Sequence, residues 1–285
     1  MREAVIVSTA RTPIGVAFKG ALNNIKSPTL MGHAISHAVE RAGVDPGAID
    51  DVVIGSVLTA GTAGMNVARL SAMAAGLPNT VAGQTIDRQC SSGLMAIATA
   101  AKQIMVDGQT IAVAGGQENI SAIQNTYLKW VGDEQDPNVI AQAEHAYMPM
   151  LMESKAAEQQ GLAPLGIYRG MAVAGNAPEE MGIGPVYAIP KLLKQAGLSV
   201  SDIGLWELNE AFACQALYCR DHLGIDPAIY NVSGGAISIG HPYGMTGARQ
   251  VGHALLEGKR RGVKYVVTSM CIGGGMGAAA LFEVC

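Results

Sequence analysis

Residues 42–56 read AGVDPGAIDDVVIGS, in which the end of a predicted helix leads into a short apolar strand. Residues 196–208 read AGLSVSDIGLWEL and repeat this pattern, and the offset between Gly43 and Gly197 is 197 − 43 = 154. Recurrence at a fixed distance indicates duplicated structural units. The sequence therefore predicts two related halves. The same offset joins three further pairs, in the same order along the chain: Ile49 with Ile203, Gly93 with Gly247, and Val113 with Val267.

Short runs rich in Val and Ile alternate with longer, Ala-rich stretches of helical period. This alternation is typical of helices that cover a mixed or parallel sheet, so the predicted fold class is α/β. The boundary between the halves is expected near residues 151–165. Strands are expected at 4–8, 51–56, 110–114, 168–174, 204–208 and 264–269, and helices at 30–42, 67–75, 92–106, 186–196, 211–222 and 246–257.

Composition excludes several classes of function. The formal net charge is −4, and 49% of the residues are hydrophobic, which is enough to bury a core. The only basic cluster is short, so a nucleic-acid partner is not expected. No apolar run approaches the length of a membrane span, and no signal-peptide pattern is present, so a cytoplasmic protein without a membrane partner is expected. The five cysteines lack metal-ligand spacing, which favours reduced thiols over a metal site or disulfides.

Cys90 lies in the segment DRQCSSG, residues 87–93, directly before an Ala-rich helix. A helix N-terminus presents unpaired amides and the positive end of the helix dipole, and both favour a thiolate. The small residues that follow Cys90 allow another molecule to come close. A free cysteine is also commonly a small buried hydrophobic residue. Both interpretations stay open for Cys90 taken alone.

Residues 231–249, NVSGGAISIGHPYGMTGAR, place five glycines around His241. Many histidines are structural, and that interpretation suits the other five, but the glycines expose His241 and the repeat brings it opposite Cys90. A cysteine paired with a histidine is the arrangement that activates a thiol nucleophile. His241 is therefore the candidate base. The five structural histidines are His33, His37, His145, His222 and His253.

Two further loops carry polar or glycine-rich patterns. Residues 270–277, MCIGGGMG, could cradle phosphate, but no Lys or Ser/Thr completes a P-loop. Backbone amides directed at an oxyanion fit better, with Cys271 as an acid or base. Residues 207–212, ELNEAF, place Asn209 at a strand end, where it could cap a helix or hold a water or a carbonyl oxygen.

Together the four loops resemble those of thiolases, CoA-dependent enzymes that make and break carbon–carbon bonds by Claisen chemistry. The order and spacing of the motifs match as well. The resemblance implies two thiolase-type halves with mixed sheets in αβαβα layers, acyl-CoA and CoA as substrates, and no covalently bound cofactor. The matching segments are RQCSSG (88–93), NEAF (209–212), GHP (240–242) with Gly244 and Gly247, CIGGG (271–275), RTPIG (11–15) and MGIGP (181–185).

The resemblance also implies a role for each motif. His241 would take the thiol proton of Cys90, which would attack an acyl-CoA thioester. Cys271 would remove the α-proton of a second acyl-CoA, or protonate the departing enolate in the reverse direction. Decarboxylating ketosynthases would show two histidines and no cysteine at the last loop, so Cys271 argues against them. The enolate oxygen would rest on His241 and a water held by Asn209, with Glu210 in support, and the acyl oxyanion on the amides of Cys90 and Gly273.

One departure from the family concerns the lid over CoA, which thiolases carry between the halves. Here YMPM (147–150) runs directly into LMESK (151–155), so most of the lid is expected to be absent at this join. The segment is either truly deleted, which would weaken CoA binding, or not included in the sequence. Loss of a core strand should cost as much as a domain's whole stability, which favours the second explanation. The expected division is 1–120 for the N-terminal half, 121–150 for a lid remnant, 151–160 for the end of that half and 161–285 for the C-terminal half.

The leading hypothesis is an acyl-CoA:acetyl-CoA C-acyltransferase of fatty acid metabolism, forming a homodimer or homotetramer. Its contact region would be residues 64–69, GMNVAR, which resemble the family's interface. A non-catalytic acyl-CoA or lipid-binding relative is one alternative, but a binder has no need of Cys90, His241 and Cys271 together. A cysteine hydrolase is another, in which Cys271 and its glycines would have no role.

Overall fold

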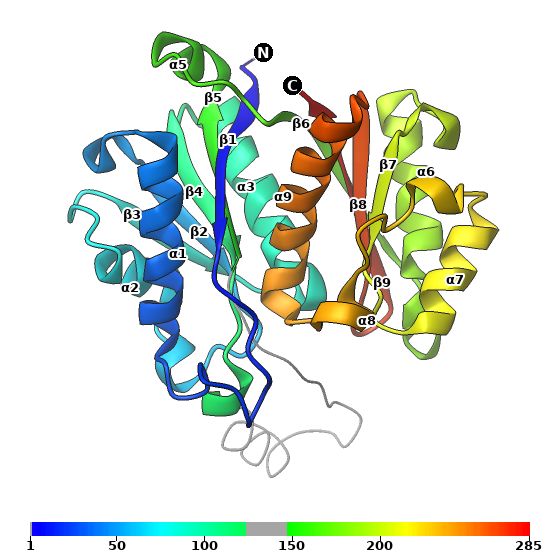
Figure 1. Cartoon of the computed structure of the whole chain (residues 1–285), viewed down its shortest axis with the longest axis horizontal. Helices are drawn as coiled ribbons and strands as arrows, with labels where there is room; N and C mark the ends of the chain where they lie inside the picture. The colour runs from blue at the N-terminus through cyan, green and yellow to red at the C-terminus, as the bar shows by residue number, and fades with distance from the viewer. Residues whose placement is uncertain (1, 124–146) are drawn as a thin grey trace.

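The computed structural model describes residues 2–123 and 147–285, and it has the predicted alternation of strands and helices (Figure 1). The strands are β1 (Ala4–Arg11), β2 (Asp51–Gly55), β3 (Ala82–Ile86), β4 (Ile111–Gly116), β5 (Tyr147–Glu153), β6 (Gly166–Gly175), β7 (Leu205–Leu208), β8 (Tyr265–Ile272) and β9 (Met276–Val284). The helices are α1 (Ser27–Ala42), α2 (Val67–Ala74), α3 (Ser92–Val106), α5 (Ser154–Gln159), α6 (Gly184–Ala196), α7 (Ala213–His222), α8 (Ala236–Ile239) and α9 (Tyr243–Arg261).

The strands form one mixed sheet with the order β3-β2-β4-β5-β1-β6-β9-β8-β7. Its two halves meet where β1 and β6 pair antiparallel over two residue pairs. Outward from this contact, β5 corresponds to β9, β4 to β8, and β2 to β7. β2 pairs parallel with β4 as β7 does with β8, and the inner pairs β4–β5 and β8–β9 are antiparallel. The symmetric order supports the duplication that the sequence predicts.

The offset seen in the sequence also relates the boundaries of the elements. β2 begins at 51 and β7 at 205, and β4 begins at 111 and β8 at 265, so both offsets are 205 − 51 = 265 − 111 = 154. α1 ends at Ala42 and α6 at Ala196, again 154 residues apart, and each is closed by a glycine in the left-handed conformation. Only glycine takes that conformation without steric cost, which explains why AG recurs at both helix ends.

Three apolar clusters define the layers. The residues of β2 alternate between two of them, because Val52 and Ile54 pack with α1 and α2, whereas Val53 packs with α3 and α9. β8 alternates in the same way, with Val266 in the central cluster and Val267 in the cluster of α6. Helices α3 and α9 therefore lie between the two half-sheets, and the other helices cover the outer faces. This is the αβαβα layering that the resemblance implies.

The N-terminal turns of α3 and α9 meet at glycines, at the centre of the molecule. A methyl group at Gly93 would lie 2.3 Å from the carbonyl oxygen of Gly244, and one at Gly116 would lie 1.7 Å from the same atom. Any side chain at these positions would push the two helices apart. The glycines of the Cys90 and His241 motifs therefore serve first to bring those two loops together.

The chain around the Met150/Leu151 join corrects one expectation. The sequence predicted that only the end of a strand remained there, and that a core strand had been lost. In the structure residues on both sides of the join form β5, which pairs antiparallel with β1 and with β4. Met150 and Leu151 are fully buried. A core strand is therefore present, and its supposed loss no longer favours an omitted segment.

Two strands were missed in the sequence, β3 and β9. β3, AGQTI, contains few of the β-branched residues that mark strands, and β9, MGAAALFEV, has an Ala run that is typical of helices. Pairing with β2 and with β6 and β8 overrides these propensities. Of the predicted lid remnant, residues 124–146 lie outside the described residues. No helix among the described residues is long and apolar enough to cross a membrane.

Candidate active site

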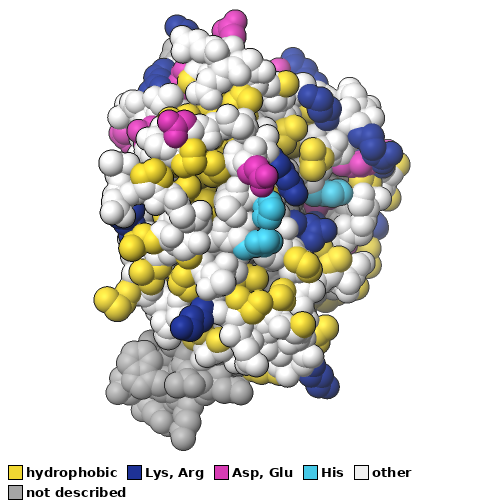
Figure 2. Space-filling view, turned by 60° about the vertical axis from the view of Figure 1, so that its left-hand side comes forward, with side chains coloured by type: hydrophobic (Ala, Val, Ile, Leu, Met, Phe, Trp, Pro, Cys, Tyr) yellow, Lys and Arg dark blue, Asp and Glu magenta, His cyan; other side chains and the backbone are white. Residues whose placement is uncertain are grey.

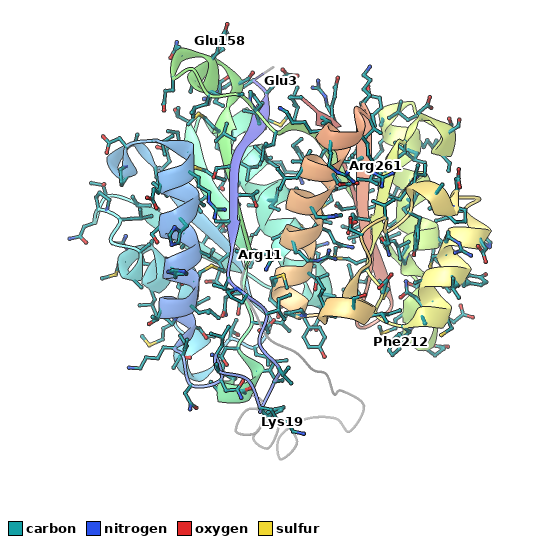
Figure 3. The ribbon with its side chains drawn as sticks, viewed as in Figure 1. Glu3, Arg11, Lys19, Glu158, Phe212 and Arg261 are labelled. Carbon is teal, nitrogen blue, oxygen red and sulfur yellow. The ribbon has the colours of Figure 1, made fainter. Side chains whose placement is uncertain are left out.

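The four sequence motifs lie at one end of the sheet. Cys90 lies beyond the carboxyl end of β3, and Asn209 lies beyond that of β7. Cys271 is the second-last residue of β8. His241 lies between α8 and the start of α9, at the lower end of the molecule in Figure 1. Phe212, which follows β7, is labelled at the same end in Figure 3. Ligand sites in sheets of this kind form outside the carboxyl ends of parallel strands.

Cys90 is held in a strained turn that leads into α3. The preceding residue, Gln89, has φ 46°, in the left-handed region that non-glycine residues rarely adopt. The hydroxyl of Ser92 stabilises this turn, because it donates to the Gln89 carbonyl at 2.6 Å and accepts from the Arg88 amide at 2.8 Å. Strain of this kind is concentrated at functional sites. The turn directs a buried thiol toward the centre between the two halves.

The thiol of Cys90 is protonated in the resting protein. Burial raises its pKa to about 11, although the backbone amides of Gly273 and Cys90 itself both lower it. The prediction that the helix N-terminus favours a thiolate is therefore wrong in its net effect. Desolvation of the charged form outweighs the amides and the dipole. The thiolate must form as the substrate reacts, with a base taking its proton.

This protonation state predicts how Cys90 reacts with iodoacetamide as the pH changes. Below its pKa, a thiol loses about tenfold in thiolate with each unit of falling pH, so the alkylation rate should rise steadily from about pH 7 to about pH 10. Peptide mass spectrometry at timed intervals measures this rate, with the exposed Cys214 as an internal reference. A plateau below pH 8 would contradict a buried neutral thiol.

Cys271 and Gly273 meet Cys90 from the C-terminal half. The amide of Gly273 hydrogen-bonds the Cys90 sulfur and lowers its pKa. Cys271 is fully buried in β8, opposite Gly277 of β9. Burial raises its pKa to about 12, and the charge of the Cys90 thiolate contributes to this shift. Two cysteines and an amide donor from the two halves therefore converge, and the catalytic roles expected for them stay a prediction.

The hydrogen bonds of His241 define its tautomer. The hydroxyl of Thr246 donates to the Pro242 carbonyl at 2.9 Å, so it accepts from His241 Nδ1–H at 2.7 Å. Nε2 therefore carries the lone pair, and the Asn209 amide nitrogen donates to it at 3.1 Å. Asn209 thus binds the histidine instead of capping a helix. The imidazole is held in the form of a base.

Electrostatics keep His241 neutral. Burial lowers its pKa to about 4, and the positive charge of Arg249 lowers it further. Between the described side chains of His241 and Cys90 there is no hydrogen bond. Tyr243 is near both groups, because its ring meets His241 edge-on at 5.3 Å. Burial raises the pKa of Tyr243, and the charges of Cys90 and Glu118 raise it further. Catalytic hydrogen bonds commonly tighten only when substrate binds.

Glu210 lies outside this centre. Its carboxylate accepts from the Asn231 side chain at 3.1 Å and from the Ile237 amide at 3.0 Å. Asn231 in turn bonds both the amide and the carbonyl of Leu208. Glu210 therefore fixes the glycine loop that leads to His241, and its expected part in supporting the oxyanion stays a prediction.

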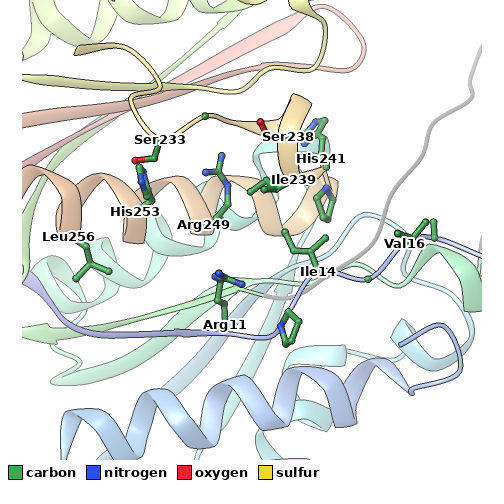
Figure 4. Close-up of a pocket in the computed structure, with 16 residues that line it drawn as sticks. Arg11, Ile14, Val16, Ser233, Ser238, Ile239, His241, Arg249, His253 and Leu256 are labelled. Atoms are coloured by element: carbon green, nitrogen blue, oxygen red, sulfur yellow. The ribbon is translucent and has the colours of Figure 1, made fainter. Parts of the chain in front are cut away.

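A cavity of about 870 Å³ opens beside His241, between the segment after β1, the chain from 233 to 242 and the middle of α9 (Figure 4). Its described lining residues include no Asp or Glu, and they include Arg11, Arg249 and His253. Behind this lining the buried carboxylate of Glu207 accepts from Arg249 at 3.4 Å and from His253 at 2.9 Å. The cavity therefore suits a neutral or anionic ligand that reaches His241.

Three residues of the centre were missed in the sequence, namely Thr246, Tyr243 and Glu118. Thr246 lies five residues after His241, in the first turn of α9. The predicted start of this helix could have suggested that the two side chains lie close together. Glu118 follows β4 and has no motif that marks it. Within residues 2–123 and 147–285, no group of three or more His, Cys, Asp or Glu side chains could hold a metal ion.

Comparison with known proteins agrees with this geometry along the whole chain. The family model "Thiolase, N-terminal domain" matches residues 4–163, and "Thiolase, C-terminal domain" matches residues 162–284. The 3-ketoacyl-CoA thiolase of Bacillus subtilis is 35% identical over 391 positions, which cover 100% of both chains. The peroxisomal 3-ketoacyl-CoA thiolase B of Mus musculus is 33% identical, over 99% of this chain and 91% of the relative.

Solved structures give the same result. The acetyl-CoA acetyltransferase of Bacillus anthracis superposes with a TM-score of 0.89 at 30% identity, covering 100% of this chain and 99% of the other. The human mitochondrial 3-ketoacyl-CoA thiolase in complex with CoA also gives 0.89, at 26% identity, covering 100% and 98%. Against the Bacillus subtilis relative, 391 − 285 = 106 aligned positions have no residue in this chain. The chain belongs to the thiolase family.

Proposed function

We propose that this acyl-CoA C-acyltransferase works through an acyl intermediate on Cys90. Its family and its curated relatives identify the enzyme class. The observation that carries the residue assignment is the Gly273 amide directed at the Cys90 sulfur, with Cys271 beside it. A thiol with an amide donor at its sulfur and a second buried thiol nearby suits acyl transfer followed by proton transfer at carbon.

In the first half-reaction His241 Nε2 takes the Cys90 proton as the sulfur attacks the thioester carbonyl. The oxyanion that forms accepts from the amides of Cys90 and Gly273, and CoA leaves as its thiol with the proton from His241. Removing one donor of such a pair commonly costs about 3 to 4 kcal/mol of transition-state stabilisation. The neutral imidazole and its fixed tautomer support this role.

In the second half-reaction the Cys271 thiol passes its proton to His241 Nε2, and the resulting thiolate removes the α-proton of acetyl-CoA. The carbanion attacks the acyl carbon on Cys90, whose sulfur leaves as a thiolate and takes the proton back from His241. A new carbon–carbon bond forms, the bond between the acyl group and sulfur breaks, and Cys90 is released. While it carries this proton, His241 donates through Nε2–H to the enolate oxygen, and the Asn209 amide nitrogen, which lies 3.1 Å from Nε2, donates beside it. Thiolysis runs the same steps in reverse, with CoA taking the acyl group.

An assay with acetoacetyl-CoA tests this function. With free CoA present, the protein should convert acetoacetyl-CoA to two acetyl-CoA molecules. Chromatography of the CoA esters measures this conversion. Without CoA it should release no free acetate at a comparable rate. Consumption of acetoacetyl-CoA that does not require CoA would instead identify a cysteine hydrolase, and no consumption by folded protein would favour a binding relative.

We infer that the cavity beside His241 receives the pantetheine arm or the acyl group, since it leads to the catalytic base and contains no acidic lining residue among those described. The 106 positions without a counterpart support the prediction that most of the lid is absent. CoA is then held by fewer contacts, and its KM should be high for a thiolase.

We also propose a homodimer through the segment 64–69 and the edge strand β3. Met65 is 95% exposed and Met73 is 52% exposed. Hydrophobic side chains are scattered over the face that Figure 2 turns toward the reader. The Asn66 side chain donates to the Gly83 carbonyl at 2.8 Å, which fixes this segment against β3. An exposed apolar patch beside a sheet edge is typical of an association surface.

The variant Met65→Asp should convert the dimer to a monomer in sedimentation experiments, because a charge would be buried at the contact. Val106→Asp is the matched control, since Val106 is 77% exposed at the far end of α3. Equal masses for wild type and both variants would contradict this interface. A cytoplasmic location stays a prediction, because the relatives include both bacterial and peroxisomal forms.

A further inference from the structure

Glu118 is a fully buried carboxyl group that the sequence did not single out. It follows β4, and its side chain is 0% exposed. One oxygen accepts from the Leu58 amide at 2.8 Å, the other accepts from the Gly244 amide at 3.1 Å, and the Val57 amide approaches both at 3.2 and 3.3 Å. The carboxyl group therefore joins three backbone amides from two separate parts of the chain.

These amides belong to the two halves of the active site. Val57 and Leu58 follow β2 in the N-terminal half, which carries Cys90. Gly244 is the second residue of α9 in the C-terminal half, three residues after His241. Its carbonyl oxygen faces Gly93 and Gly116, where even a methyl group would not fit. Gly244 is thus held from both sides, by glycine packing at its carbonyl and by Glu118 at its amide.

The charge of Glu118 acts on the pKa of the proposed nucleophile, Cys90. Burial raises the pKa of Glu118 to about 8, and the charge of Asp87 adds to this shift. An ionised Glu118 would raise the pKa of Cys90 and that of Tyr243. A change in the position or the charge of Glu118 therefore changes the pKa of the Cys90 thiol.

We propose that Glu118 is a positioning residue, whose carboxyl group fixes the turn carrying His241 against the half that carries Cys90. The hydrogen bonds from Leu58 and Gly244 to the two oxygens of one carboxyl group set the distance between base and nucleophile. This role rests on the proposed function of Cys90 and His241. Glu118 itself does not touch the substrate.

Glutamine is the informative replacement, because it has nearly the same shape. Its side chain offers one oxygen acceptor and one NH₂ donor, whereas the native carboxylate, ionised above its pKa of about 8, accepts on both sides. In Glu118→Gln an NH₂ group would face a backbone N–H, either that of Leu58 or that of Gly244. One of the two hydrogen bonds that join the halves through this side chain would then be lost. A displacement of about 1 Å at a catalytic group can cost about 10²-fold in rate.

The test compares Glu118→Gln with Glu153→Gln. Glu153 is also a buried glutamate, 6% exposed, that accepts from a backbone amide, that of Ala156 at 3.1 Å, but it lies at the start of α5 at the opposite end of the sheet. Both variants should lower the melting temperature. Only Glu118→Gln should lower kcat, by about 10²-fold with KM unchanged. It should also speed the alkylation of Cys90 at a fixed pH above 8, because loss of the Glu118 charge lowers the pKa of that thiol.

A kcat for Glu118→Gln within threefold of wild type, or an equal loss of kcat in Glu153→Gln, would overturn the proposal. If Glu118→Gln does not fold, Glu118→Asp replaces it, because aspartate keeps both acceptors but is one methylene too short to reach both halves. Glu118→Asp should also lower kcat with KM unchanged, and wild-type kcat in this variant would overturn the proposal. A wild-type enzyme that forms no acyl adduct on Cys90 would instead refute the proposed function, and the alkylation comparison would still test the effect of Glu118 on that thiol.

Discussion

Replacing Cys90 with alanine should lower kcat for thiolysis on the order of 10⁵- to 10⁶-fold, the loss observed when the nucleophile of a covalent acyl-transfer enzyme is removed. The substitution deletes a single sulfur from a buried site, so the fold should remain intact. Binding of CoA esters should remain as well, because the cavity beside His241 does not include Cys90. The measurement is kcat with acetoacetyl-CoA and CoA, alongside the melting temperature.

Cys219→Ala is the matched control for this variant. Cys219 is also fully buried, in α7, and burial also raises its pKa to about 11, but it bonds only the Gln215 side chain and the Gly182 carbonyl. It should keep wild-type kcat. If Cys219→Ala lost as much activity as Cys90→Ala, or if Cys90→Ala retained activity, the nucleophile would have to lie elsewhere.

Replacing Cys271 with alanine should separate the two half-reactions. Acylation of Cys90 by acetyl-CoA should proceed, because His241 and the Gly273 amide are unchanged. Condensation should fall by about 10²- to 10⁴-fold, the usual contribution of a general base. The reason is that no other described thiol or carboxylate at the centre is placed to remove the α-proton. Rapid quenching gives the acylation rate, and formation of acetoacetyl-CoA gives the condensation rate.

The outcome for Cys271→Ala distinguishes a thiolase from a hydrolase in one protein. A stable acyl-enzyme that no longer condenses supports the two-cysteine mechanism. If acylation and condensation fell together, Cys271 would act on Cys90 rather than on the second substrate. If neither changed, Cys271 would be a structural core residue, in keeping with its complete burial in β8.

The residues for which we propose a direct chemical role could be picked out in the sequence, because each lies in a loop motif rich in small residues and the 154-residue repeat relates the two halves. Cys90, His241 and Cys271 carry their reactivity in their side chains, and the turns around them need glycine. The fold class followed from the alternation of Val- and Ile-rich runs with Ala-rich stretches of helical period. What propensity could not reveal was β9, whose Ala run pairs as a strand only because β6 and β8 lie on either side of it.

Other features depend on three-dimensional context that a sequence does not display. The net pKa of Cys90 depends on how deeply the thiol is buried, and burial outweighs the helix N-terminus that the sequence did show. Glu118 matters because of which backbone amides reach it, and amides have no signature in a sequence. The strand β5 forms from residues on both sides of the Met150/Leu151 join, which only its pairing with β1 and β4 reveals.

The central claim is that Cys90 accepts the acyl group, and the most direct measurement is mass spectrometry of the intact protein after brief mixing with acetyl-CoA, followed by peptide mapping. We predict one acetyl group per chain, located on Cys90, that is removed by free CoA much faster than by water. Folded protein that gains no acetyl group, or that gains one on Cys271 or Cys214 instead, would contradict the claim.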